Sequence, residues 1–429
     1  MRPLSRILPA NLVRLFRVRD FALLWSGSTV SMAGDGVYFV AIAWEVYRIS
    51  NLPAALGVVS AAFGLPQVLL LLVGGVISDR ADRRLVMLWG NVVSAVMVGG
   101  IGVLVLVGRA GLPDLVLLVA AYGIGQAFFL PASRAIVPSL VDAELLPQAM
   151  AVEQFVQPLT GGLLGPAVGG LLIALHGTGF AFLVDAASFA VAAAAMAAMG
   201  RARIAPAPGE GAVGQRSVLR DAGRALRFVR SVPWIWAGLV AAGLANVALT
   251  GPLQVLVPFL IKYRLHGDAQ DLGWFGAVGG LGAISVAVYV AWRGIPRHQV
   301  ACIFITWAVG TLALVPAALA GSVWALIPCS FFISGGVSFG NLVWFARMGV
   351  QVPGQLLGRV ASLDMTVSFA LTPFSNAVTG PVAQVVGARA LLLGTGAVAT
   401  VLTLAFLLVP GVHRDLPPVA AAASVDGGS

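Results

Sequence analysis

Charged side chains are scarce in this sequence, since Asp, Glu, Lys and Arg together make up 10% of its 429 residues. A soluble domain carries about 25%, so the scarcity excludes an ordinary water-soluble protein. Hydrophobic residues reach 59%, and they recur in long runs close to the ~20 residues that cross a bilayer as a helix. The composition therefore predicts an all-α integral membrane protein whose membrane part is nearly the whole chain.

Cysteine, histidine and lysine are also rare. Cys302 and Cys329 both lie in apolar runs, which excludes a disulfide framework, and the four histidines show no spacing of metal ligands. The single lysine, Lys262, does not lie in a G-x-x-x-x-G-K-[ST] phosphate loop, so no ATPase is encoded. The net charge of +9 is spread over short segments, which does not fit a nucleic-acid-binding patch. We expect no enzyme activity, no metal, no cofactor and no nucleic-acid partner.

Polar segments and Pro/Gly turns divide the chain into about twelve apolar spans. The basic N-terminal segment leads directly into the first of them, so we expect a retained anchor and not a cleaved signal peptide. If the N-terminus is inside, the outer side receives only a few of the 26 basic residues, namely Arg48, Arg109, Lys262, Arg264 and Arg389. This bias predicts a multi-pass protein of the cell inner (plasma) membrane with both termini cytoplasmic. The expected spans are 21–48, 54–77, 85–108, 114–135, 146–175, 178–199, 234–262, 270–292, 298–320, 322–346, 361–386 and 388–410.

One long polar segment divides these spans six and six. We expect an N-terminal six-helix bundle in 1–200, a basic cytoplasmic linker in 201–232, a C-terminal six-helix bundle in 233–412 and a flexible cytoplasmic tail in 413–429. Residues 217–230 place apolar side chains on one side of a helix and arginines on the other. This pattern predicts either an amphipathic helix on the inner leaflet or an ordered linker without lipid contact.

A glycine- and arginine-containing segment, GGVISDRADRR at residues 74–84, lies between the second and third spans. It resembles the G-x-x-x-D-R-x-x-R-R signature of the major facilitator superfamily, with matching residues at Gly75, Asp79, Arg80, Arg83 and Arg84. The resemblance implies the major facilitator fold and a gate at the cytoplasmic side. In this gate Gly75 lets a neighbouring helix approach closely and Asp79 binds a facing helix N-terminus. Arg134, at the inner end of the fourth span, is assigned to the same gate. The alternative is a basic loop that only sets the topology.

A second motif, GGLLGPAVGG, lies in the fifth span. Glycines four apart form a smooth helix face for close packing, and a proline removes one backbone hydrogen bond and bends the helix. The segment is similar to the antiporter motif of the same superfamily, with matching residues at Gly161, Gly165, Pro166, Gly169 and Gly170. The similarity implies a pliable interface on which the fifth span rocks against the other half. The alternative is a generic packing face.

The first half also resembles a branch of the superfamily that contains macrolide-type drug exporters and siderophore exporters. The similar pieces include Trp25, Gly34-Asp35, Ala43-Trp44 and PASRAIVP at 131–138. The resemblance implies a secondary active transporter that works by alternating access. Many drug/proton antiporters carry an arginine midway down the fourth span, where this chain has Gln126. A proton relay through such an arginine therefore does not fit this sequence.

Acidic residues inside the expected spans are the candidates for proton coupling, and they are Asp35, Glu45 and Asp185. Asp35 lies about fourteen residues into the first span, near mid-depth, where an ionised carboxylate is costly. It is the leading candidate, because a carboxyl isolated from water holds a proton and releases it when its cavity opens. The alternative is an Asp satisfied by a neighbour such as Ser31 or by a helix end. Glu45 lies near the outer end of the first span and Asp185 part-way into the sixth.

These patterns together predict a proton-coupled exporter, an antiporter of small amphiphilic molecules such as drugs, siderophores or secondary metabolites. The alternative is a proton-coupled uptake permease of the same fold, because one fold hosts both directions. The expected partners are a small-molecule substrate, protons and the lipid bilayer. We expect the protein to work as a monomer.

Overall fold

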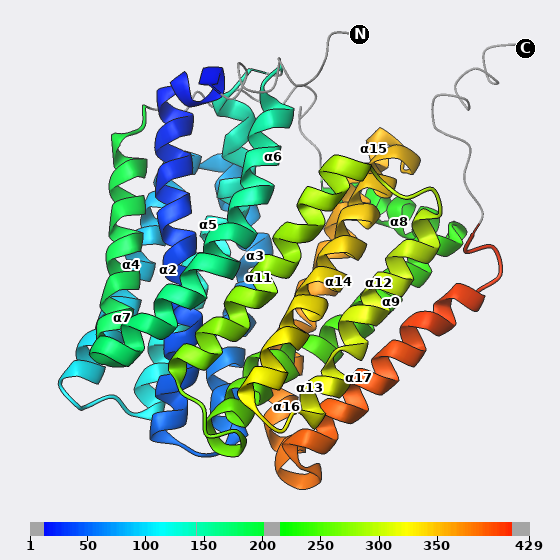
Figure 1. Ribbon diagram of the computed structural model, residues 1–429. Coiled ribbons are helices and arrows are strands. Elements are labelled where there is room, and N and C mark those ends of the chain that lie inside the picture. The colour runs from blue at the N-terminus through cyan, green and yellow to red at the C-terminus, as the bar shows by residue number, and fades with distance from the viewer. Residues whose placement is uncertain (1–12, 143, 201–214, 414–429) are drawn as a thin grey trace, which may run out of the picture.

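Helices make up all the regular structure of the described residues, which are 13–142, 144–200 and 215–413 of this computed structural model (Figure 1). The predicted tail after His413 and the first part of the predicted linker, 201–214, lie outside the described residues. For the described part of the chain the all-α prediction is confirmed.

The first bundle contains the elements from α2 to α7. They are α2 (Arg19–Ile49), α3 (Pro53–Arg80), α4 (Arg83–Leu106), α5 (Leu112–Leu140), α6 (Leu146–Gln157), the π-helical turn η1 (Pro158–Leu164) and α7 (Gly165–Ala198). Gly177 has φ +82°, a left-handed conformation that suits glycine, and there the chain turns back inside α7. The turn η1 precedes Pro166, which lacks an N–H and crowds the carbonyl four residues earlier, so the helix widens at this point.

The second bundle contains the elements from α9 to α17. They are α9 (Pro233–Gly251), η2 (Pro252–Leu256), α10 (Val257–Phe259), η3 (Leu260–Arg264), α11 (Ala269–Arg293), α12 (Gln299–Leu312), α13 (Leu314–Leu319), α14 (Val323–Gln351), α15 (Gly354–Ala370), α16 (Thr372–Val386), α17 (Ala388–Ala405) and the short 3₁₀ turn η4 (Phe406–Leu408). Pro258 follows η2 in the same way that Pro166 follows η1, so both bundles contain a widened turn next to a proline.

A further helix, α8 (Gln215–Ser231), lies within the predicted linker and matches the helix expected at 217–230. Ala225 and Val229 are buried, and α8 contacts α9 and α15. Protein therefore covers part of its apolar face, and contact of the remaining face with lipid stays a prediction.

Nine helical stretches of the described residues have the length and hydropathy of membrane spans. One of them, Gln148–Ala198, has 51 residues and turns back at Gly177, so it contains two crossings. The helix α2 and the pair α15 and α16 also run along the bundles (Figure 1). With these included, the predicted total of about twelve crossings in two six-helix bundles is confirmed.

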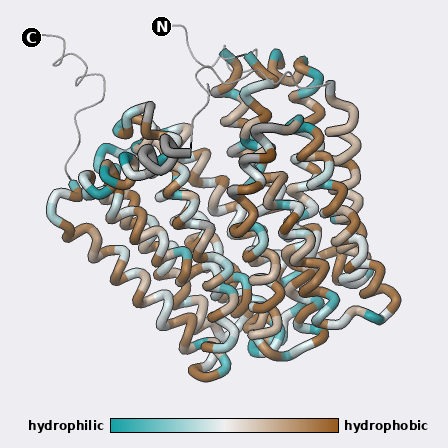
Figure 2. Tube along the Cα trace, turned by 180° about the vertical axis from the view of Figure 1, so that it is seen from behind, coloured by the Kyte–Doolittle hydropathy of each residue, from teal (hydrophilic) through white to brown (hydrophobic). Residues whose placement is uncertain are grey.

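Large apolar side chains cover the sides of the molecule. Leu69, Leu117 and Trp292 are 66%, 70% and 78% exposed, which a water-soluble surface does not favour. Hydrophobic residues follow the lengths of the helices, and hydrophilic residues concentrate near their ends (Figure 2). This distribution fits helices whose sides contact lipid.

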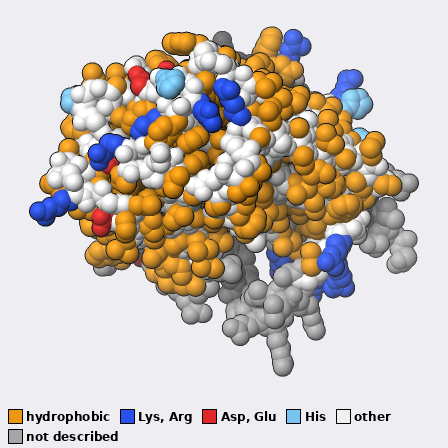
Figure 3. All heavy atoms as spheres, turned by 90° about the horizontal axis from the view of Figure 1, so that it is seen from below, with side chains coloured by type: hydrophobic (Ala, Val, Ile, Leu, Met, Phe, Trp, Pro, Cys, Tyr) orange, Lys and Arg blue, Asp and Glu red, His pale blue; other side chains and the backbone are white. Residues whose placement is uncertain are grey.

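The two ends of the molecule differ in how the bundles meet. We call the end where α2 begins and α8 lies the linker end, and the end where α2 finishes the loop end. The bundles converge toward the loop end and diverge toward the linker end (Figure 1). Between them, α3 packs on α16 and α7 packs on α11. Seen from the loop end, the surface is mostly apolar with scattered charged side chains (Figure 3).

Candidate functional site

A cavity of about 490 Å³ lies between the bundles, with walls from α2, α3 and α5 on one side and α9, η2 and α16 on the other. Four aromatic rings line it, those of Tyr38, Phe39, Phe63 and Tyr122. Among the described residues that line this cavity, Asp35 carries the only ionisable acidic group, and none is Lys, Arg or His. The other polar lining residues are Ser60, Gln67, Gln126, Thr250, Gln254, Thr372 and Asn376.

Two further cavities adjoin the first one on its linker-end side. One, of about 350 Å³, is lined by Arg134 and Asp364 and shares Thr372 with the first cavity. The other, of about 1080 Å³, lies between the η1–α7 segment and the helices α11 and α14, and it shares Phe39 with the first cavity. Further cavity space therefore lies next to the Asp35 cavity on the side of the linker end.

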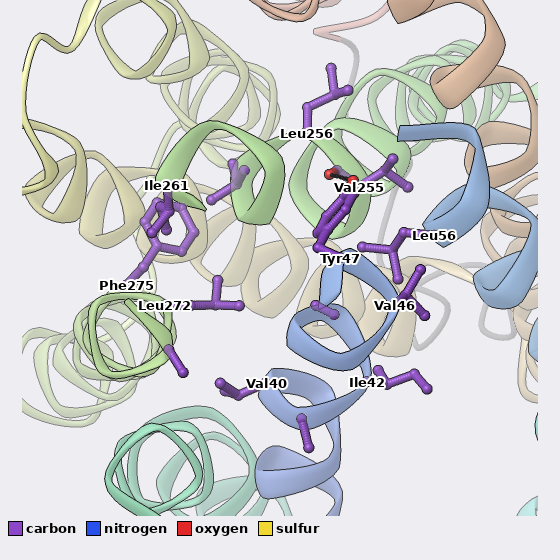
Figure 4. Packing of buried hydrophobic residues seen from close by; sticks show 14 of the residues in the cluster. Val40, Ile42, Val46, Tyr47, Leu56, Val255, Leu256, Ile261, Leu272 and Phe275 are labelled. Atoms are coloured by element: carbon purple, nitrogen blue, oxygen red, sulfur yellow. Dashed lines mark hydrogen bonds between the residues drawn. The ribbon is translucent and has the colours of Figure 1, made fainter. Parts of the chain in front are cut away.

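At the loop end, α2 is joined directly to the η2–η3 segment of the second bundle. The Tyr47 hydroxyl donates a hydrogen bond to the Val255 carbonyl oxygen at 2.7 Å, and the Tyr263 hydroxyl donates one to the Tyr47 carbonyl oxygen at 2.7 Å. The Lys262 ammonium lies 4.7 Å from the centre of the Trp44 ring. Tyr47 and Val255 belong to a packed apolar cluster built from both bundles (Figure 4). In this conformation the cavity is closed at the loop end.

Asp35 lies in the middle of α2, sixteen residues after its first residue, Arg19, which agrees with the predicted depth. Its Oδ1 accepts a hydrogen bond from the Tyr122 hydroxyl at 2.9 Å. Ser31, the neighbour considered as a partner from the sequence, is buried, and the described residues show no hydrogen bond between it and Asp35. The partner comes from another helix instead, because α5 presents a tyrosine ring to the cavity.

Asp185 lies on α7, where it packs against α2, and it does not line the cavity. It is fully buried, and its Oδ1 accepts a hydrogen bond from the Ser188 hydroxyl at 3.2 Å. The carboxyl packs against the backbone of Gly34, next to Asp35, where a Cβ would overlap it. Its Oδ2 has no hydrogen-bond partner among the described residues. The structure thus brings two of the three acidic candidates close together, because Asp185 of α7 packs against Gly34, the residue before Asp35 in α2.

Glu45 lies apart from these two residues, near the loop end. Its carboxylate forms an ion pair with Arg48 at 2.6 Å and accepts a hydrogen bond from the Thr178 hydroxyl at 2.6 Å. It is fully buried and is not among the described residues that line the central cavity. An acid held this way joins α2 to the start of the sixth crossing, and its part in proton coupling stays a prediction.

The predicted gate residues lie where α3 ends and α4 begins. An added Cβ at Gly75 would meet no atom within 4 Å, so the expected close approach of a neighbouring helix is absent in this conformation. The reason is that the bundles diverge at the linker end (Figure 1). The side chains of Asp79 and Arg80 lie outside the described residues.

Two arginines of the same motif bind helix carbonyls within the first bundle. Arg83 donates to the Ala135 carbonyl oxygen at 2.9 Å. Arg84 donates to the carbonyl oxygens of Met196 and Ala197, each at 2.7 Å, at the end of α7. Cations are favourable at a helix C-terminus, so Arg84 stabilises this end of the bundle.

The glycine motif has two faces. One face packs on α2 in the same bundle: a Cβ at Gly165 would lie 2.7 Å from the Gly36 Cα, and one at Gly169 would lie 2.8 Å from the Val37 Cα. Gly161 lies on this face as well, beside the Met32 carbonyl oxygen.

The other face packs on α11 of the second bundle. A Cβ at Gly170 would lie 2.8 Å from the Gln270 Cα, and one at Gly276 would lie 2.7 Å from the Pro166 Cβ. A Cβ at Gly280 would lie 2.5 Å from the Gly162 carbonyl carbon. Contact with the other half therefore involves Gly162, Pro166 and Gly170, whereas Gly161, Gly165 and Gly169 pack within the first bundle.

Four tyrosines at this site were not assigned from the sequence. The chain has only five tyrosines, and Tyr38 and Tyr122 lie at the cavity while Tyr47 and Tyr263 close the loop end. The available signal was a tyrosine within an apolar run. A buried tyrosine hydroxyl needs a hydrogen-bond partner, so such a residue indicates a polar contact inside the protein.

Two six-helix bundles around a central cavity define a major facilitator transporter, and solved structures share this fold. One is a peptide transporter POT in complex with sulfate, with a TM-score of 0.70 and 15% identity over 91% of this chain and 95% of that chain. Another is a bacterial homolog of the human lysosomal transporter Spinster, inward-facing and unoccupied, with a TM-score of 0.65 and 16% identity over 92% and 96% of the two chains. At these identities the likeness shows the fold alone.

The family described as "Transmembrane secretion effector" matches residues 13–425, and the chain belongs to this family. A similar protein is the multidrug efflux pump Tap of Mycolicibacterium fortuitum, 28% identical over 92% of this chain and 94% of that protein. Another is the enterobactin exporter EntS of Salmonella typhimurium, 25% identical over 93% of this chain and 95% of that protein. The resemblance to the drug and siderophore exporter branch is confirmed, and the chain is a multi-pass membrane transporter and not an enzyme.

Proposed function

We propose that this chain is a proton-coupled exporter, an antiporter that moves small amphiphilic molecules out of the cell in exchange for protons. The observation that carries the proposal is Asp35, a carboxyl at mid-helix that lines the central cavity and is bonded there to Tyr122. The family description and the names of the efflux pump Tap and the exporter EntS support the outward direction.

The proposed orientation places the linker end and both termini in the cytoplasm. The basic residues between the spans support it, because they gather on that side of the predicted topology. The conformation described above is then open toward the cytoplasm and closed toward the outside. The protein works as a monomer, since each chain contains a complete cavity between its two bundles.

In the proposed cycle, substrate from the cytoplasm and a proton from outside occupy Asp35 in turn. When the cavity faces the cytoplasm, water reaches Asp35, the proton leaves and substrate binds. As the bundles then rock, the α7–α11 and α3–α16 contacts rearrange, the bonds at Tyr47 break, and the cavity opens outward. A proton from outside displaces the substrate and allows the return. Asp185 is the second candidate for the proton, because it packs next to Asp35 on α2.

The test is transport of a labelled compound panel into inside-out membrane vesicles with and without an acidic lumen. An exporter accumulates substrate in the lumen when the lumen is acidic, and an uptake permease expels it under the same gradient. Asp35→Asn keeps the size of the side chain and removes its titratable proton, so gradient-driven accumulation should disappear. Glu144→Gln is the matched control, since Glu144 is an exposed acid of the same bundle far from the cavity lining.

The proposal fails in either of two ways. Accumulation by Asp35→Asn at the wild-type rate, with the same pH dependence, would move the coupling proton to Asp185 or to another ion. Expulsion of substrate from the acidic lumen by the wild type would establish the uptake permease.

A further inference from the structure

We infer that the central cavity selects amphiphilic molecules with a single positive charge, bound with the cationic group against Asp35 and Tyr38 and the apolar body toward Phe63. The inference rests on the proposed function and narrows its substrate class. It follows from the sign of the charges around the cavity, from the rings in its wall and from the Asp35 oxygen that Tyr122 does not bind.

The charges around the cavity have one sign. Asp35 is the only ionisable acid among its described lining residues, and no lysine, arginine or histidine is among them. A second carboxyl, Asp185, lies directly behind it against Gly34. Among the described residues that line the two adjoining cavities, Arg134 is the only basic one, and Asp364 lines the same cavity. A bound anion would meet carboxyl groups with no basic partner, which is costly in a low-dielectric site.

Aromatic rings surround the carboxyl. Tyr38 lies one helical turn after Asp35 and meets the Tyr122 ring edge to face, with 5.3 Å between the ring centres. Phe63 lies 5.0 Å from Tyr122, measured between ring centres. The faces of such rings attract ammonium, pyridinium and phosphonium groups, and they also bind flat apolar bodies. A carboxylate beside aromatic faces therefore fits an organic cation better than a neutral or anionic molecule.

The cavity wall also contains an acceptor without a donor. Asn376 is 2% exposed, and its amide nitrogen donates to the Gln254 side-chain oxygen at 2.9 Å. Its Oδ1 has no hydrogen-bond partner among the described residues. On the other side of the cavity, Tyr122 occupies only one of the two Asp35 oxygens. The second Asp35 oxygen can thus accept an N–H group from a substrate, as a protonated amine provides, whereas the Asn376 Oδ1 is enclosed by protein in this conformation.

The Asp35 carboxyl can bind either the cation or the proton, but not both at once. Protonated Asp35 leaves the described lining without a charge, so a cation loses its counter-ion as soon as the proton arrives. Proton arrival from outside therefore releases the substrate.

The test compares two dyes that differ in one charge, on purified full-length protein in lipid nanodiscs at pH 8. The cationic dye is 4-(4-dimethylaminostyryl)-N-methylpyridinium, and the neutral dye is the same molecule without the N-methyl group. Anilinonaphthalene sulfonate is the anionic probe. We expect the cation to bind at least about tenfold more tightly than the neutral dye, which corresponds to ~1.4 kcal/mol. Charge-assisted and cation–π contacts supply preferences of this order.

Variants assign the preference to the site. Asp35→Asn should abolish it, Asp35→Glu should keep most of it, and the exposed control Glu144→Gln should leave it unchanged. Tyr38→Leu should weaken cation binding several-fold more than binding of the neutral dye. Tyr38→Leu tests the site without changing the carboxyl.

The outcomes separate the inference from the proposed function. Equal binding of the two dyes, preference for the sulfonate, or an undiminished preference in Asp35→Asn overturns the inference. If proton-driven transport of neutral compounds persists in that case, the proposed function stands. A cation preference that depends on Asp35, together with vesicles in which a pH gradient drives no transport, supports the inference and overturns proton coupling.

Discussion

Replacing Gly280 by alanine should shift the protein away from the conformation described above. Gly280 lies on α11, facing the η1–α7 segment, and a Cβ there would lie 2.5 Å from both the Gly162 carbonyl carbon and the Leu163 amide nitrogen. Ordinary contacts of a Cβ begin at 3.4 Å, so η1 and α11 must separate by up to about 0.9 Å at this point. The obstacle is backbone, which cannot rotate away as a side chain can.

The expected size of the shift follows from the cost of overpacking, which is about 1–3 kcal/mol. If only the conformer closed at the loop end makes this contact, its population falls about 5- to 150-fold relative to the conformer closed at the linker end. Gly394→Ala in α17 is the control, because a Cβ there meets no atom within 4 Å. Gly165→Ala is a second comparison, since it crowds α2 in the same bundle and should lower stability without changing the ratio of conformers.

Double electron–electron resonance measures this ratio directly. Spin labels at Glu144→Cys and Ile295→Cys, in a background where Cys302 and Cys329 are replaced by serine, report the distance between the two bundles at the linker end. Gly280→Ala should raise the short-distance population and leave the thermal midpoint of unfolding within a few degrees of the parent. An unchanged distance distribution in Gly280→Ala would refute the claim that the α7–α11 contact belongs to one conformer.

Three other predictions follow from the gate, the loop end and the topology. Asp79→Asn should impair transport in vesicles while membrane abundance stays near normal; wild-type transport rates would remove the proposed gate. Tyr263→Phe deletes the hydrogen bond to the Tyr47 carbonyl oxygen, worth about 1 kcal/mol, and so destabilises the closed loop end. In single-molecule distance measurements the loop end should therefore open outward about fivefold faster. Reporter fusions at Gly209 and Asp268 should report opposite sides of the membrane, and agreement between them would show that a span was miscounted.

Hydropathy was sufficient to predict the crossings, because each apolar run must satisfy its backbone within one helix. The position of Asp35 in the middle of α2 followed from counting alone. Its partner did not, because Tyr122 is 87 residues away in the sequence and only the packing of α2 on α5 brings them together. The bond between Tyr47 and Val255 spans 208 residues and was equally out of reach.

The glycine motif shows a second limit of sequence reasoning. Its pattern predicted a close helix contact, and such contacts exist, but the sequence GGLLGPAVGG places small residues on more than one side of the helix. Which side faces the other bundle depends on the rotation of α7, which is set by its packing on α2 through Gly165 and Gly169. A one-dimensional pattern contains no information on that rotation.

The single lysine, Lys262, lies where it can report the opening of the loop end. Apart from the N-terminal amine, Lys262 is the only primary amine in the 429 residues, so amine-directed reagents modify one side chain without any mutagenesis. While its ammonium is stacked on the Trp44 ring, a reagent must compete with that contact. Separation of the bundles at the loop end frees the amine from the Trp44 ring. The rate of acylation of Lys262 and the change in tryptophan fluorescence should therefore both report outward opening in protein without substitutions.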